Sequence, residues 1–384
     1  MRFEFATATR IVFGQGVVKE VAALARPFGK RAMVVTGKDK IRHAGIINGL
    51  EGAGFTCNLF GVSGEPTVAL VREGADLLRA SPSNLVIAIG GGSAIDAGKA
   101  IAATAANPGD VLDYLEVVGQ GRPLPNSPLP FIAVPTTAGT GSEVTRNAVL
   151  GSPEHGVKAS LRSPLMLPAI ALVDPELTFG LPRAITASTG LDALTQLIEP
   201  YVCSRANPLT DALCRDGLAT VARSLPRVCV NGGDVEARIG MSYASLLGGL
   251  ALANAGLGVV HGFAAPIGGM FDAPHGAICA ALLPHGMAAN IRALRDRAPE
   301  SASLVRYAEI AQILTGKSDA RPEEGAEWVR IFVAQLAVPP LRTYGVTENH
   351  VPGLAEKASL ASSMKANPLP LTMDELTWIL RAAL

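Results

Sequence analysis

The stretch NLVIAIGGGSAIDAGK, residues 84–99, decides the fold of the first half of the chain. Its first six residues form a near-continuous apolar run, which is typical of a strand covered on both faces of a parallel sheet. Three glycines follow, and an Ala-rich helical pattern then continues to Ala106. A strand that passes through glycines into a helix leaves backbone N–H groups free at the positive end of the helix dipole. The stretch therefore predicts a phosphate-binding loop, with a purely structural strand-to-helix turn as the alternative.

This glycine loop matches neither of the two common nucleotide-binding patterns. The dinucleotide pattern G-x-G-x-x-G, counted from Gly90, requires a glycine at the position of Ile95. The pattern G-x-x-x-x-G-K-[ST], ending at Lys99, requires Gly and Ser or Thr where the chain has Ser93 and Ala100. We therefore expect a phosphate loop of a third type.

Short β-rich runs and helical patterns alternate around this stretch. Strands are predicted at residues 31–36, 56–60 and 131–134, and helices at residues 46–54 and 67–80. Such alternation is typical of an α/β fold with an open parallel sheet. Beyond residue 175 the patterns become long, Ala- and Leu-rich and helical. We predict an N-terminal dinucleotide-binding parallel-sheet α/β domain over residues 1–174, followed by an all-helical C-terminal domain over residues 175–384.

A second polar loop follows the strand predicted at residues 131–134. Its sequence, PTTAGTGSE at residues 135–143, contains two glycines and four hydroxyl side chains: Thr136, Thr137, Thr140 and Ser142. Alone, it is equally well explained as an ordinary polar turn. Because the carboxyl ends of parallel strands meet at one edge of a sheet, we expect both loops to converge there.

The helical half holds a third group of polar residues. Asp192 and Gln196 are spaced i, i+4 and therefore share a helix face. His261, His275 and His285 lie within 25 residues of one another in a segment poor in charge. Histidine is the commonest metal ligand and the usual acid–base group near neutral pH. Taken singly, each histidine is better explained as a core or surface residue than as a ligand.

Composition excludes several classes of protein. The 384 residues include 33 basic and 33 acidic side chains, and 48% are hydrophobic, so that neither a disordered chain nor a nucleic-acid partner is expected. Five scattered cysteines and no apolar leader indicate a cytoplasmic protein with reduced thiols. Residues 241–271 lack charged side chains, but glycines and Pro266 interrupt them. We expect a buried helix-loop-helix there and no membrane partner.

Five ordered motifs now identify a resemblance. GGGSAIDAGK, PTTAGTGSE, LVDPELTFGLP, TGLDALTQLIE and NAGLGVVHG…PHG…LLPHG resemble the iron-containing (group III) alcohol dehydrogenases. The resemblance implies NAD or NADP in the α/β domain and a metal and substrate site in the helical domain. It implies hydride transfer between nicotinamide and an alcohol, aldehyde or ketone carbon in the cleft between the domains. It further implies a homodimer or larger assembly.

The resemblance also implies roles for individual residues. Lys158 would reach the cofactor ribose, and His261 or His275 would polarise the substrate carbonyl if no metal were present. The metal positions would be Asp192, Gln196, His261 and His275. The cofactor positions would be Gly37, Gly91, Gly92, Ser93, Asp96, Thr136, Thr137, Thr140, Ser142 and Lys158.

The chain departs from the family pattern at three positions. Gln196 and Ala265 stand where family members have histidines, and Gly37 stands where NAD-preferring members have Asp. An amide oxygen is a poor ligand for Fe²⁺ or Zn²⁺, so we expect a weak metal site. Without an acidic residue at Gly37, we expect NADP(H) to be accepted. Two alternatives stay open: a metal-independent reductase resembling maleylacetate reductase, and a non-catalytic cofactor-binding protein.

Overall fold

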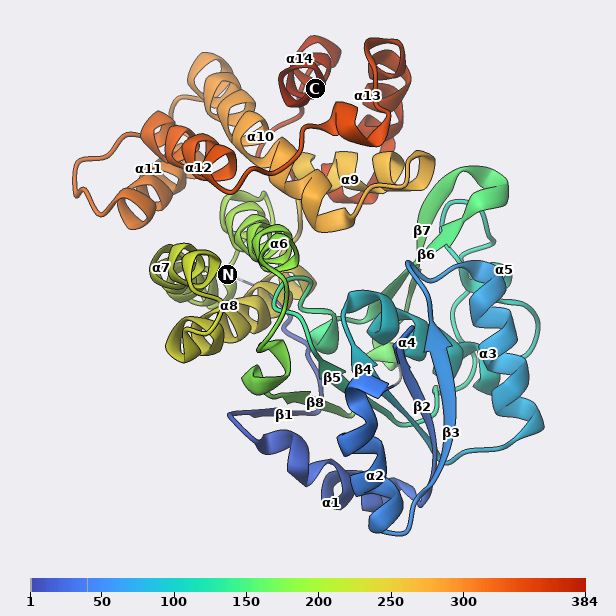
Figure 1. The fold of residues 1–384 in the computed structure, drawn as a ribbon. Helices are drawn as coiled ribbons and strands as arrows, with labels where there is room; N and C mark the ends of the chain where they lie inside the picture. Colours follow the sequence, from blue (N-terminus) through green and yellow to red (C-terminus); the bar gives the residue numbers. More distant parts are fainter. Residues whose placement is uncertain (1, 40) are drawn as a thin grey trace. The chain divides into compact units, whose positions relative to one another are not determined.

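The computed structural model describes residues 2–39 and 41–384, which separate into two compact units (Figure 1). The α/β unit comprises Ala6–Thr137 and Gly141–Phe179. The helical unit comprises Gly180–Leu384, Ala138–Thr140 and the N-terminal segment ending at Phe5. The predicted fold class, a parallel sheet followed by a helical region, is confirmed. The domain boundary at residues 174 and 175 stays a prediction.

The α/β unit is built on one six-stranded parallel sheet. The strand order is β1-β8-β5-β4-β2-β3, and every neighbouring pair is parallel. The strands are β1 (Arg10–Phe13), β2 (Arg31–Gly37), β3 (Thr56–Val62), β4 (Leu85–Gly90), β5 (Phe131–Pro135) and β8 (Ile170–Val173). The helices are α1 (Val21–Ala25), α2 (Ala44–Gly52), α3 (Val68–Ala80), α4 (Gly92–Ala106) and α5 (Val111–Tyr114). The sequence patterns did not predict β1, β8 or the antiparallel hairpin of β6 (Asn147–Ser152) and β7 (Val157–Arg162).

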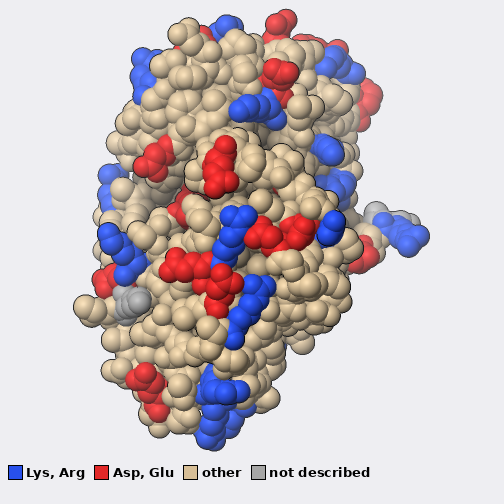
Figure 2. Space-filling model, turned by 90° about the vertical axis from the view of Figure 1, so that its right-hand side faces the viewer, with Lys and Arg blue, Asp and Glu red and all other residues tan. Residues whose placement is uncertain are grey.

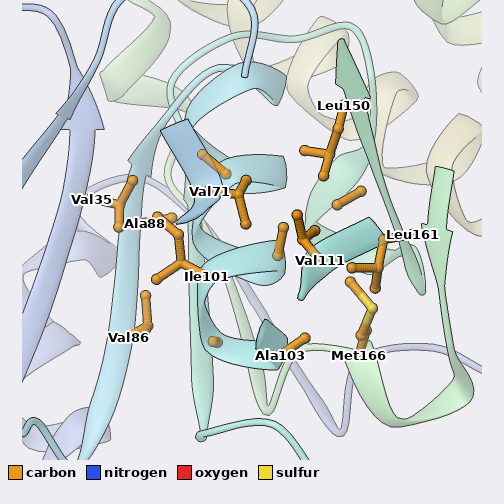
Figure 3. Close-up of a cluster of buried hydrophobic side chains, with 14 of the residues drawn as sticks. Val35, Val71, Val86, Ala88, Ile101, Ala103, Val111, Leu150, Leu161 and Met166 are labelled. Carbon is orange, nitrogen blue, oxygen red and sulfur yellow. The ribbon is translucent and has the colours of Figure 1, made fainter. Parts of the chain in front are cut away.

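Alternating side chains of the strands build a core on each face of the sheet. Val34 and Ile87 pack with α1 and α2 on one face. On the other face, Val35 and Ala88 pack with α3, α4 and the β6–β7 hairpin (Figure 3). A strand buried on both faces requires apolar residues at every position, which explains the uninterrupted run in β4.

The strand order reverses direction between β2 and β4. From β2 the chain continues outward to β3, whereas from β4 it continues to β5 on the opposite side. Open parallel sheets bind ligands outside the carboxyl ends of the strands at such a switch point. Here those ends are Gly37 of β2 and Gly90 of β4.

The described part of Gly180–Leu384 contains helices and no strand. Its α-helices are α6 (Arg183–Val202), α7 (Pro208–Val230), α8 (Val235–Asn254), α9 (Val259–Met270), α10 (His275–Arg297), α11 (Ala302–Thr315), α12 (Pro322–Gln335), α13 (Val351–Leu360) and α14 (Met373–Ala383). Residues 241–271, the segment without charged side chains, form most of α8 and all of α9. These two helices meet at a bend of 96°. By length and composition α10 could cross a membrane, but 83% of its apolar window is buried inside the protein, as in a core helix.

Charged side chains of both signs are interspersed on the face drawn in Figure 2. This mixture agrees with the equal numbers of basic and acidic residues in the chain. A face of this kind lacks the single-sign field that draws polyanions to nucleic-acid-binding proteins.

Candidate functional site

Four potential metal ligands from three helices meet inside the helical unit. Asp192 lies on α6, His261 on α9, and His275 and Cys279 on α10. One donor atom from each residue lies within 4.8 Å of the other three. Asp192 Oδ1 is 3.6 Å from Nε2 of both His261 and His275. The cluster therefore converges on one point.

The orientation of His261 is fixed from behind by Glu199. The ring Nδ1 of His261 lies 2.7 Å from Glu199 Oε2, and the Val260 backbone N–H donates to Glu199 Oε1 at 2.7 Å. A carboxylate accepts and does not donate, so His261 carries its proton on Nδ1. Its Nε2 faces the cluster and is the nitrogen that a metal would bind, which is the usual arrangement behind a metal-binding histidine. The Val259 N–H donates to Asn367 Oδ1, so two side chains hold the N-terminus of α9.

Glycine at position 276 allows α10 to approach α6 closely. A Cβ at Gly276 would lie 2.6 Å from the carbonyl oxygen of Ser188 on α6, which is closer than real contacts allow. The adjacent His275 is thereby brought to the same helix that carries Asp192. The Pro-His-Gly motif thus combines a donor with the small residue that positions it.

Opposite charges in the cluster outweigh the cost of burial. Burial alone lowers the pKa of His261 and His275, but Cys279 and Asp192 raise it, well above the usual value for His261 and to about 9 for His275. Burial raises the pKa of Asp192 and of Cys279, but the two histidines lower both below their usual values. The site therefore stabilises two anionic donors beside positive charge, as a divalent cation requires.

Two buried oxygen atoms in this region have no hydrogen-bond partner. They are Asp192 Oδ1 and Gln196 Oε1, and both side chains are almost completely buried. Buried polar atoms normally have a hydrogen-bond partner, so two such oxygen atoms without one indicate that a ligand binds here. A divalent metal at the convergence point would satisfy Asp192, and the donor set of carboxylate, imidazole and thiol suits Zn²⁺ or Fe²⁺. The residues present therefore fit a metal ion.

Three of the four predicted metal residues, Asp192, His261 and His275, belong to the cluster, and the fourth, Gln196, lies beside Asp192 on α6. The structure adds two residues to this site. His285 lies apart, with its ring edge-on to Trp378 at a centroid distance of 6.2 Å. Sequence reasoning missed Cys279 and Glu199. The signals were the spacing of four residues from His275 to Cys279 and of seven from Asp192 to Glu199, both of which keep side chains on one helix face.

The predicted phosphate loop lies at the carboxyl end of β4. Gly91 is the N-cap of α4, and no side chain caps the first turn, which contains Gly92 and Ser93. An uncapped helix N-terminus is the arrangement that a phosphate site requires. A Cβ at Gly91 would lie 3.3 Å from the Thr137 side chain of the second loop. The Thr136 N–H donates to the Gly90 carbonyl at 2.9 Å. The two loops are therefore side by side, as expected from the parallel sheet.

A buried ammonium ties the second loop to α4. Lys99 is 1% exposed, and its Nζ donates to the Ser142 carbonyl at 2.9 Å and to Thr145 Oγ1 at 3.0 Å. Asp96, one turn earlier, lies 3.4 Å from Lys99 and accepts hydrogen bonds from Ser142 Oγ and from the Val149 N–H. Burial lowers the pKa of Lys99, and Asp96 opposes that shift. Asp96 and Ser142 thus bond to each other and hold the loop.

The remaining predicted cofactor residues occupy three different settings. Lys158 on β7 forms an ion pair with Glu65. Thr140 belongs to the short segment Ala138–Thr140, which packs on α6 of the helical unit through Gly139 and Thr189. Gly37 ends β2, and its backbone N would lie 3.7 Å from a Cβ at Gly90, so it borders the phosphate loop.

Comparison with known proteins covers the whole of the chain. Residues 8–175 match the model of the iron-containing alcohol dehydrogenases, and residues 186–384 match the C-terminal domain of that family. The chain is 36% identical to 1,3-propanediol dehydrogenase of Klebsiella pneumoniae, covering 99% of this chain and 98% of the relative. It is 33% identical to the NAD-dependent methanol dehydrogenase of Bacillus methanolicus, covering 97% of each.

A solved structure gives the same result. The crystal structure of 1,3-propanediol oxidoreductase superimposes with a TM-score of 0.90 at 34% identity and covers 100% of both chains. Fold, ordered motifs and site geometry therefore agree with the sequence comparison. The chain belongs to the iron-containing alcohol dehydrogenase family and is an oxidoreductase that acts on alcohol CH–OH groups.

Proposed function

We propose that the chain transfers a hydride between NAD or NADP and a small alcohol or its aldehyde, using a divalent metal held by Asp192, His261 and His275. The main support for this proposal is that these donors converge around Asp192 Oδ1, a buried carboxylate oxygen without a hydrogen-bond partner. Oxidation removes a hydride from the carbinol carbon to the nicotinamide and a proton from the hydroxyl to solvent. The reverse reaction reduces the aldehyde or ketone.

The α/β unit supplies the cofactor site in this proposal. The N–H groups at the start of α4, with Gly91, Gly92 and Ser93, bind the pyrophosphate. Thr136 and Thr137 lie beside that loop and face the nicotinamide side of the cofactor. These five residues contact the cofactor directly.

Other predicted cofactor residues support the cofactor site indirectly in this proposal. Asp96 and Ser142 bond to each other and fix the second loop, so they position it and do not need to touch the cofactor. Thr140 borders the same loop. Lys158 reaches the ribose by leaving its ion pair with Glu65.

A metal held by these residues would act as a Lewis acid on the alcohol or carbonyl oxygen, at a coordination position beyond its protein ligands. The residues of the chain hold the donors in place: Glu199 fixes the tautomer of His261, and Gly276 lets His275 approach Asp192. We propose that Asp192, His261 and His275 on their own bind iron or zinc weakly, because the amide oxygen of Gln196 is a poor ligand for either ion.

We propose that NADP(H) is accepted alongside NAD(H), because Gly37 offers no negative charge near the adenosine ribose. The names of the relatives, propanediol and methanol dehydrogenase, favour small primary alcohols and diols as substrates. We further propose a cytoplasmic enzyme that assembles as a homodimer or larger.

The test is turnover of the purified protein with NADH and NADPH across a panel of short aldehydes, ketones and unsaturated keto acids. Consumption of reduced cofactor with aldehydes supports the proposal. Turnover of keto acids alone, unchanged after chelation, would indicate the metal-independent reductase. Tight cofactor binding without turnover on any member of the panel would contradict the proposed reaction.

A further inference from the structure

The cluster contains a thiol that the family pattern does not require. Cys279 lies one helical turn after His275 on α10, so both side chains project from the same face of the helix. Its Sγ is 3.7 Å from His275 Nε2 and 4.0 Å from His261 Nε2. Cys279 is fully buried, and none of the other described cysteines belongs to the cluster.

The spacing of the donors matches a tetrahedral metal centre. Zinc–nitrogen and zinc–oxygen bonds of about 2.0–2.2 Å and a zinc–sulfur bond of about 2.3 Å place neighbouring ligand atoms about 3.3–3.6 Å apart. The observed separations are 3.6 Å from Asp192 Oδ1 to each histidine Nε2, and 3.7 and 4.0 Å from the sulfur to those nitrogens. Small movements of the side chains would bring these separations to the values around a bound zinc ion.

A second, independent observation points to a ligand at this place. Asp192 is 1% exposed, and its Oδ1, which faces both histidines, has no hydrogen-bond partner. Gln196, beside Asp192 on α6, offers only an amide oxygen, which is a hard and weak donor. A thiolate is a far better donor to zinc.

We propose that Cys279 is the fourth protein ligand of the metal, and that the site selects zinc(II) over iron(II). The inference rests on the proposed function, because it concerns the same metal site. Cys279 on α10 supplies the strong fourth donor that the amide of Gln196 on α6 does not. Gln196 stays outside the ligand set, next to Asp192. On binding, the Cys279 thiol releases its proton to solvent and a zinc–sulfur bond forms, with no change in oxidation state.

Zinc X-ray absorption of the full chain, stripped with a chelator and reloaded with zinc, tests this directly. We expect one sulfur scatterer at about 2.3 Å together with nitrogen and oxygen scatterers. The sulfur scatterer should disappear in Cys279→Ser, whose side chain is of similar size, and the zinc affinity should fall at least tenfold.

Two control variants test whether the effect is specific to the metal ligand Cys279. Gln196→Ala should keep the sulfur scatterer. Cys229→Ser, at a buried cysteine on α7 outside the cluster, should keep both the scatterer and the affinity. Reloading with equal concentrations of Zn²⁺ and Fe²⁺ without oxygen should give mainly zinc in the wild type, and the preference should fall at least tenfold in Cys279→Ser.

A zinc site with only nitrogen and oxygen scatterers in the wild-type protein, or a wild type that binds no zinc, would overturn the inference. Turnover of aldehydes, measured on the same samples, distinguishes a failure of the Cys279 assignment from a failure of the proposed function. Turnover without a zinc–sulfur bond removes Cys279 from the ligand set and leaves the proposed function. A zinc–sulfur bond without turnover supports the ligand assignment and contradicts the proposed function.

Discussion

Replacing Gly37 by aspartate should convert the chain into an NAD-selective enzyme. Gly37 ends β2 at the switch point of the sheet, and it is not among the glycines with positive φ. A Cβ at this position would meet no atom within 4 Å. The structure therefore gives no steric reason for a glycine at this position. Gly37 is half-buried but has open space around it, so Gly37→Asp should change the free energy of unfolding by no more than about 0.5 kcal/mol, as substitutions away from packed features usually do.

The size of the effect follows from charge repulsion. A ribose 2′-phosphate carries a charge of about −2 near neutral pH. Each pair of unit charges about 4 Å apart repels by about 1 kcal/mol in a watery setting, so the aspartate costs NADP(H) about 2 kcal/mol. That corresponds to a loss of about 30-fold in kcat/KM with NADPH. NADH should be unaffected or improved, because the carboxylate accepts a hydrogen bond from the 2′-hydroxyl.

The assay is kcat/KM for NADPH and NADH with one aldehyde in the wild type, Gly37→Asp and Gly37→Ser. The serine variant fills similar space without charge and should resemble the wild type. The reasoning is refuted if the wild type shows no measurable rate with NADPH at saturating aldehyde, or if the aspartate variant loses both cofactors equally.

Three further predictions concern the ligand supports and the loop. Glu199→Gln should lower zinc affinity by about 10–100-fold, because the amide places an N–H against the Val260 N–H and weakens the hold on His261. An unchanged zinc dissociation constant in competition titrations would show that Glu199 does not support His261. Zinc affinity should rise with pH, by about tenfold per unit for each proton displaced, up to about 9, because the pKa of His275 is raised to about 9 and the metal must displace that proton. A flat profile from calorimetry between about pH 6 and 8 would be inconsistent with it. Lys99→Met should lower the free energy of unfolding in urea by about 3–5 kcal/mol, since it leaves buried carbonyls and Asp96 without their partner; a loss below about 1 kcal/mol would show that the network does not hold the loop.

Local sequence patterns predicted the strands β2, β3, β4 and β5 and the glycine turn that follows β4. The apolar run ending at Gly90 gives a strand buried on both faces, and the Ala-rich pattern after it gives α4. β1 is only four residues long and mostly half-buried, so it carries no clear pattern. The β6–β7 hairpin has one buried face and short alternation, which a search for parallel strands passes over.

The candidate metal site was predictable only in part. Asp192, His261 and His275 are chemically distinctive and come together in the structure. Glu199 shares a helix face with Asp192, but its contact with His261, across 62 positions of sequence, is created by the packing of the helices. Cys279 reads as an ordinary buried thiol until α10 is placed against α6 and α9.

Metal content and alcohol oxidation measured on one preparation test the central claim most directly. The protein is analysed as purified, after chelation, and after zinc is restored, and each sample is assayed for alcohol-dependent formation of reduced cofactor. The account predicts that the rate follows the zinc content, falling on removal and returning on restoration. Full turnover by the metal-free protein would contradict it.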